Sequence, residues 1–289
     1  MTNTQQQQLM ERLAALIGDH YVFPDVADAI VAELGGVNLD GATAEQVAER
    51  LTERIQSINN DRHLRVRCRP SGALEGHEDW EKHYAAEAIQ NAGGVKTVTR
   101  LDALTGLLAI APYTSPVHLA ERYVAAAFEL LAGVERLVID LRAGRGGTPE
   151  TIALICGYLL GSEPVHLQDI VDRDGGTRQY WTSPAAGRLD DSVCIAVLTS
   201  SRTFSGGEEL AYNLQAHQRA TIVGQRTGGG AHPVEVFALT DVLEVAVPVA
   251  RSVNSVTGTN WEQVGVLPDV ECDPDIALER AVDLLNAPA

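Results

Sequence analysis

The apolar positions of the chain follow two different rhythms, and the change comes near residue 60. Before it, leucine, isoleucine and valine recur every three or four residues, as on one face of a helix. Thr43 followed by Gln46 also matches a capping box at a helix start. Residues 1–60 are therefore expected to form a separate N-terminal three-helix domain. The three apolar faces are Leu9, Leu13 and Leu16; Val26, Ile30 and Leu34; and Val47, Leu51 and Ile55.

After residue 60, short apolar runs are separated by segments with helical spacing. Runs of this length without alternation suit strands that are buried on both faces. They occur at 106–110, 136–141, 193–198 and 220–224, and helices are expected near 117–131 and 275–285. Residues 61–289 are therefore expected to form one α/β core.

One stretch, residues 193–216, joins an apolar strand to a helix through a hydroxyl-rich turn that contains Ser205. Ser205 and Glu208 match a capping box, so a plain helix cap explains the serine. The two glycines that follow Ser205 favour chemistry instead. A helix N-terminus offers free backbone N–H groups, and residues without a Cβ atom let a substrate carbonyl approach them. Such a turn suits an oxyanion site beside a nucleophile.

Two other polar segments lie beside expected strands. His63 stands where the last N-terminal helix gives way to a strand in which apolar residues alternate with arginines, and this strand ends at Pro70. A glycine-rich turn, 142–147, follows the apolar run that ends at Leu141. The turn matches neither common nucleotide-binding glycine pattern, so its backbone N–H groups are expected to face a pocket or merely to close a strand-to-helix turn.

The composition of the chain excludes some classes of binding partner and indicates a cellular compartment. The formal charge of −17 disfavours nucleic acid and anionic membranes as partners. The start of the chain shows no signal-peptide pattern, and no apolar stretch is long enough for a membrane helix. The four cysteines form no C-x-x-C pair, which predicts reduced core residues in a cytoplasmic protein. Neither a metal site nor a cofactor is expected.

Five motifs in a fixed order then carry a family resemblance. They are D-x-H-L-x-V from Asp61, I-D-L-R-x-x-x-G-G from Ile139, T-F-S-G-G-E-E from Thr203, T-G-G-G-A-H-P from Thr227 and N-W-E-x-V-G-V-x-P-D from Asn260. The chain resembles the S41 serine peptidases, most closely the branch with interphotoreceptor retinoid-binding protein modules and tricorn-type core proteases. The resemblance implies a ClpP/crotonase-like core of ββα units with an N-terminal helical bundle. Many S41 peptidases insert a PDZ domain before the core, but the segment between Cys68 and Gly106 is too short to hold one.

The resemblance also implies site residues. Position 230 is glycine and the chain has only two lysines, so the Ser-Lys dyad of the C-terminal-processing branch is absent. The tricorn-type arrangement maps onto Ser205 as nucleophile, His63 as general base and Glu262 as the carboxylate that orients the base. The oxyanion donors would be the N–H groups of Gly206 and of Gly146 or Gly147.

Three features leave alternatives open. His232 is a competing base on a glycine-rich loop. Gly144 replaces the usual asparagine of the D-L-R motif, and Arg62 replaces the serine that precedes the tricorn-type histidine.

Three functions fit this pattern, and the first is expected. The protein would be a serine peptidase acting on a peptide or protein substrate, with a homo-oligomer allowed. The second is a non-catalytic carrier of an apolar small molecule, like the retinoid-binding modules. The third is crotonase-like chemistry in a repurposed pocket.

Overall fold

The computed structural model describes residues 2–74, 76–183 and 185–287, which fall into two compact units. The chain enters each unit more than once. Unit 1 comprises Met1–Glu81, Ile170–Arg178 and His232–Ser252; unit 2 comprises Lys82–Asp169, Gln179–Ala231 and Val253–Ala289.

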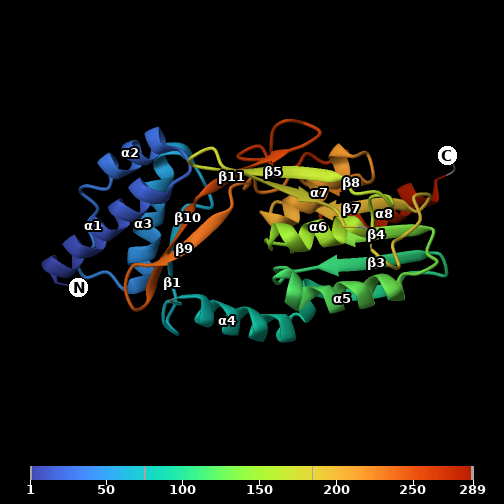
Figure 1. The fold of residues 1–289 in the computed structure, drawn as a ribbon, viewed down its shortest axis with the longest axis horizontal. Helices are drawn as coiled ribbons and strands as arrows, with labels where there is room; N and C mark the ends of the chain where they lie inside the picture. The colour runs from blue at the N-terminus through green and yellow to red at the C-terminus, as the bar shows by residue number, and fades with distance from the viewer. Residues whose placement is uncertain (1, 75, 184, 288–289) are drawn as a thin grey trace. The chain divides into compact units, whose positions relative to one another are not determined.

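Unit 1 contains the three expected helices, α1 (Asn3–His20), α2 (Pro24–Glu33) and α3 (Ala44–Asn59), seen in blue in Figure 1. Thr2 and Thr43 form capping boxes at the starts of α1 and α3. These boxes satisfy N–H groups that have no partner inside the helix.

A three-stranded antiparallel sheet completes unit 1. Its order is β1 (Arg65–Cys68), β10 (Leu243–Pro248), β9 (Val234–Ala238), and Val66 lies opposite Val245. The apolar faces of the helices pack against this sheet in one core. The expected stripe of α3 is buried in full, whereas Leu16 of α1 and Val26 of α2 are only half-buried and the neighbouring Ile17 and Ala27 are buried.

Unit 2 is built on a six-stranded sheet in the order β12-β8-β7-β4-β3-β2. Neighbouring strands run parallel except β2 and β3, which pair antiparallel. The strands are β2 (Val95–Arg100), β3 (Thr105–Ile110), β4 (Arg136–Asp140), β7 (Cys194–Thr199), β8 (Thr221–Gly224) and β12 (Val270–Glu271).

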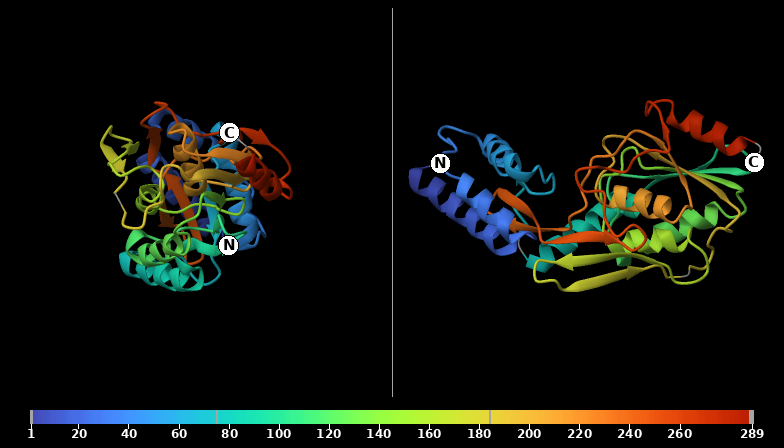
Figure 2. Two further views of the ribbon diagram at one scale, coloured as in Figure 1. Left: turned by 90° about the vertical axis from the view of Figure 1, so that its right-hand side faces the viewer. Right: turned by 90° about the horizontal axis from the view of Figure 1, so that it is seen from above.

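Helices cover both faces of this sheet (Figure 2). The larger core lies on the face covered by α5 (Val117–Leu130), α6 (Pro149–Gly157) and α7 (Gly206–Ala216). The opposite face packs against α8 (Ala277–Asn286) through small residues such as Ala277 and Ala281. The expected mixed α/β core and the N-terminal helical region are confirmed.

The remaining elements connect these layers. The segment between Cys68 and Gly106 holds α4 (Gly76–Gln90), η1 (Ala92–Gly94) and β2, and its described residues contain no PDZ domain. A third sheet has the order β11-β5-β6. Its strands are β5 (His166–Asp172), β6 (Thr177–Trp181) and β11 (Ala250–Asn254). Within the described ranges, no helix has the length and hydropathy needed to cross a membrane.

The cysteine prediction was wrong in one respect. All four cysteines are free, but only Cys156 is buried. Cys194, the first residue of β7, is exposed, whereas its neighbours Val193 and Ile195 are buried, so its side chain points away from the core.

Candidate active site

Ser205 occupies a strained turn between β7 and α7. Its backbone lies at φ 52° and ψ −124°, and the Gly207 N–H donates to the Phe204 carbonyl at 3.0 Å. This geometry is a type II′ turn with Ser205 at the position that glycine usually fills. Holding a residue with a side chain there costs about 1–3 kcal/mol, and such strain occurs mainly at functional sites.

Three hydrogen bonds hold this turn in place by tying residues 200–204 to residues 141–144. The hydroxyl of Ser200 donates to the Arg142 carbonyl at 2.7 Å, and the hydroxyl of Thr203 donates to the Leu141 carbonyl at 2.8 Å. The Phe204 N–H donates to the Gly144 carbonyl at 3.0 Å. The serine turn and the glycine-rich turn after β4 therefore form one hydrogen-bonded unit.

The glycines after Ser205 permit this close approach. A Cβ atom added at Gly206 would lie 2.8 Å from the Gly147 nitrogen, and one added at Gly207 would lie 2.9 Å from the Gly144 carbonyl oxygen. Gly146 also lies against Ser205, since its own added Cβ would be 3.6 Å from the serine Cβ. The structure therefore brings Ser205, Gly206, Gly146 and Gly147 together. Their role as nucleophile and oxyanion donors stays a prediction.

Glu208 does more than the expected capping. Its buried carboxylate accepts from the Ser205 N–H at 2.9 Å, from the Gly229 N–H at 2.6 Å and from the Gly230 N–H at 2.9 Å. The Thr227 hydroxyl donates to it as well. Burial raises the pKa of Glu208, and these hydrogen bonds offset the rise only in part. Glu208 thus ties the loop 227–230 to the serine turn, a role that the local S-x-x-E signal did not reveal.

The neighbouring Glu209 is also buried. Burial, with repulsion from Glu150, raises the pKa of Glu209 to about 8. Its carboxyl group is therefore mostly protonated at neutral pH, unlike an ordinary glutamate.

Glu262 is held by the same loop. Its carboxylate accepts from the Ala231 N–H at 2.6 Å, and the neighbouring Trp261 indole donates to the Gly230 carbonyl at 2.7 Å. Glu262 and Ser205 both belong to unit 2, whereas His63 and His232 belong to unit 1.

In unit 1, both histidines are tied to Asp61, which is 1% exposed. The His63 backbone N–H donates to its Oδ1 at 3.0 Å, and His232 Nδ1 lies 2.8 Å from its Oδ2. The Tyr21 hydroxyl donates to the same Oδ2 at 2.9 Å. Burial would raise the pKa of Asp61, but the hydrogen bond and the charge of His232 outweigh it, so the pKa is lowered.

These surroundings make the two histidines different. Burial lowers the pKa of His63 to about 3, so its imidazole is neutral at physiological pH. The ionised Asp61 can only accept, so His232 donates to it from Nδ1. Sequence reasoning missed Asp61 as a site residue, although it opens the D-x-H motif.

Two family models match the chain. The model of peptidase family S41 matches residues 105–272. The chain belongs to peptidase family S41. A second model, the N-terminal domain of peptidase S41 in eukaryotic IRBP, matches residues 2–93. The family expected from the five motifs is therefore confirmed.

Among curated relatives, the chain is 33% identical over 144 residues to the chloroplastic C-terminal processing peptidase of Tetradesmus obliquus. That match covers 50% of this chain and 30% of the relative. A match of the same identity over 153 residues, to carboxyl-terminal-processing peptidase 2 of Arabidopsis thaliana, covers 52% of this chain and 29% of that relative. The chain thus spans less than half the length of the curated relatives it matches.

Among solved structures, a putative peptidase from Parabacteroides merdae is similar over 97% of this chain and 96% of its own, with a TM-score of 0.68 and 18% identity. This likeness extends the shared fold across both units. At such low identity it speaks for the fold alone.

Proposed function

We propose that the protein is a serine-type peptidase that hydrolyses peptide bonds in peptides or proteins. The observation that carries this proposal is the strained type II′ turn that presents Ser205 beside the backbone of Gly206, Gly146 and Gly147. Membership of the S41 family supports it. A helix cap alone would not need a serine at the glycine position of the turn.

The reaction follows from the expected roles. The Ser205 hydroxyl attacks the scissile carbonyl while His63 takes its proton, and Glu262 orients the imidazole and stabilises its cationic form. The N–H groups of Gly206 and of Gly146 or Gly147 bind the oxyanion, each donor contributing about 3 kcal/mol. The base then protonates the leaving amine, and water hydrolyses the acyl-enzyme through the same groups.

The competing base is His232, and one observation favours it. The bond from His232 Nδ1 to Asp61 is the carboxylate-imidazole pair that orients a catalytic histidine in serine hydrolases. Asp61 accepts a hydrogen bond from the backbone N–H of His63, at 3.0 Å. A base with a pKa near 3 is also weak at neutral pH.

Intact mass after incubation with a fluorophosphonate tests both the function and the base. We expect a single adduct on the wild type, none on Ser205→Ala, and labelling slowed about 100-fold or more by loss of the true base. His63→Ala and His232→Ala are therefore compared directly, with His118→Ala of α5 as a matched control that should label normally. No adduct on folded wild-type protein would overturn the hydrolase proposal.

A carrier of apolar molecules is not favoured by the site. Such a carrier has no use for a strained serine or for polar groups gathered at a helix N-terminus. Peptide cleavage is the function that these features support best.

A further inference from the structure

Unit 2 contains a cavity of about 580 Å³ that the proposed reaction does not use. It lies outside the carboxyl ends of β3, β4, β7 and β8, where ligands commonly bind in open α/β sheets. Its size is within the range of pockets that hold small molecules. Leu107 and Ala109 of β3 belong to its lining.

The cavity exists because α8 covers only part of its sheet face. The helix packs on β4, β7 and β8, while Leu107 and Ala109 point to the same face from β3. The residues just before α8, Asp273 to Asp275, form one wall. The arginine side chain of Arg142 fixes this wall by donating to the Pro274 carbonyl at 2.5 Å.

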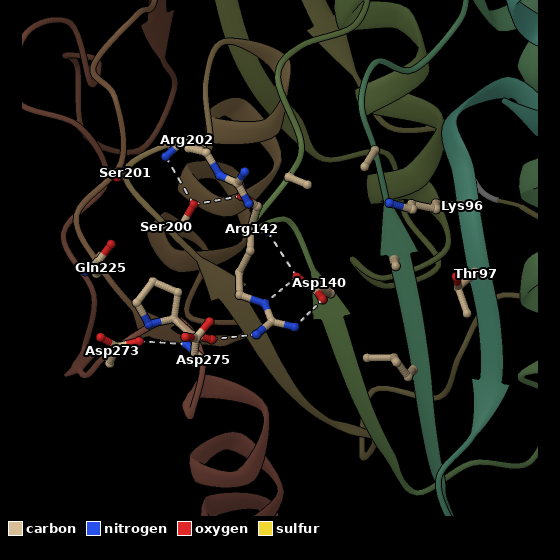
Figure 3. Close-up of a pocket in the computed structure, with 15 residues that line it drawn as sticks. Lys96, Thr97, Asp140, Arg142, Ser200, Ser201, Arg202, Gln225, Asp273 and Asp275 are labelled. Carbon is tan, nitrogen blue, oxygen red and sulfur yellow. Dashed lines mark hydrogen bonds and ion pairs between the residues drawn. The ribbon is translucent and has the colours of Figure 1, made fainter.

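Charges of both signs line the cavity. Arg142 is neutralised by Asp140, with Nε and Nη2 donating to the carboxylate at 2.9 and 2.7 Å. The remaining charged groups are Lys96 and Arg202 against Asp273 and Asp275. Figure 3 shows Lys96 on the side of the cavity away from Asp273 and Asp275, with Arg202 above them. Among the described residues, neither Lys96 nor Arg202 forms an ion pair.

This pattern selects the class of ligand. An anion would meet two carboxylates, and a cation would meet two basic groups, so neither gains from the whole lining. A ligand with an anionic and a cationic end can be attracted by the basic groups and by the carboxylates at the same time. Free amino acids and short peptides have this charge distribution.

We propose that this cavity binds a zwitterion of amino-acid or short-peptide size. Its carboxylate lies at Lys96 and Arg202, and its ammonium group lies at Asp273 and Asp275. The Ser201 hydroxyl and the Gln225 amide supply further polar groups on the lining.

The cavity wall is continuous with the serine turn. The Arg202 N–H donates to the Ser200 hydroxyl at 3.1 Å, and that hydroxyl donates to the Arg142 carbonyl. Arg202 therefore belongs to the segment that ties the serine turn to residues 141–144. If the proposed peptidase function holds, its short products belong to the ligand class of this cavity.

The test measures binding rather than turnover. Ser205→Ala protein is titrated with trialanine, trialanine amide and N-acetyl-trialanine, followed by NMR. Because exposed charge pairs are weak, we expect each blocked terminus to weaken binding about fivefold. Lys96→Met and Arg202→Met should weaken binding of trialanine but not of the amide, which has no carboxylate. Asp275→Asn should weaken trialanine but not the N-acetyl peptide.

Lys82→Met removes the other lysine of the chain and should leave all three affinities unchanged. Equal affinity for the three peptides, or equal losses of free and amidated peptide in Lys96→Met, would overturn the proposal. Since Ser205 is absent in this assay, failure of the peptidase proposal would not mimic either outcome.

Discussion

The two regions that supply the candidate catalytic groups are constructed in different ways. The serine turn of unit 2 is shaped by its backbone. Ser205 has a positive φ, the glycines allow close packing, and hydrogen bonds run to main-chain carbonyls. The histidine cluster of unit 1 is shaped by one side chain, the carboxylate of Asp61. A backbone-built region should tolerate no added atom, whereas a side-chain-built region should respond in steps to the loss of each hydrogen bond.

The largest effect is expected at Ser205, where function and stability should separate. Ser205→Ala and Ser205→Gly should both abolish fluorophosphonate labelling. Because the backbone at φ 52° suits glycine, the glycine variant should be about 1 kcal/mol more stable than the alanine variant in denaturant unfolding. At Ser201, which lies outside the left-handed region, the order should be reversed. An alanine variant as stable as the glycine variant would show that the turn is unstrained.

Gly206→Ala should come next. The new Cβ would lie 2.8 Å from the Gly147 nitrogen, so the two turns must separate. We expect labelling to slow by about 100-fold to 1,000-fold, as for loss of an oxyanion donor, and stability to fall by about 1–3 kcal/mol. Gly18→Ala in α1 is the control, because nothing lies within 4 Å of its added Cβ. Unchanged labelling in Gly206→Ala would remove this backbone from the oxyanion site.

In the histidine cluster of unit 1, Asp61→Asn keeps the size of the side chain but replaces a carboxylate oxygen with an NH2 group. The carboxylate accepts hydrogen bonds from three groups, and an NH2 group cannot accept them. We expect labelling to slow about 10-fold to 100-fold, the usual cost of losing a group that orients a functional histidine. Asp19→Asn, an exposed change in the same unit, should have no effect. If Asp61→Asn were labelled as fast as the wild type, the carboxylate would have no role beyond packing.

The last predictions concern the dependence of stability on pH, and the two regions should differ in sign. Glu209 has a pKa of about 8 when folded and an ordinary value of 4.5, so the folded state binds more protons between these values. Stability should therefore fall as pH rises from about 5 to 8, by at most about 1.4 kcal/mol per unit from this group. Glu209→Gln should flatten that slope in urea unfolding.

Asp61 has the opposite shift. Its pKa is lowered from 3.8 by folding, so its contribution is present above that value and is lost as pH falls below it. Asp61→Asn should flatten the acid limb and leave the slope between pH 5 and 8 unchanged. A slope change in the same window for both variants would contradict this contrast.

The features that the sequence predicted are local. Strand β7, the serine turn and the start of α7 are each specified by residues that are close together in the sequence. The same holds for the capping boxes of α1 and α3. The glycines after Ser205 could be singled out as a candidate site because the turn that they form with the serine is local in the chain.

The features that it did not predict depend on residues far apart in the chain. Nothing near Asp61 indicates that His232 will lie 2.8 Å from its carboxylate. The S-x-x-E pattern likewise gives no sign that Glu208 also binds the loop 227–230. Periodicity describes which face of an element is buried, and not which distant element covers it.

The discontinuous path of unit 1 has a consequence for synthesis and dissection of the protein. Val66 of β1 pairs with Val245, a residue that is synthesised much later. The helices before β1 pack against Leu239, Leu243 and Val247, which belong to the same C-terminal hairpin. On the ribosome, the first helices must therefore emerge long before their sheet can close. A fragment that stops at residue 81 would expose that unfinished core, so the N-terminal part of this chain should aggregate when expressed alone.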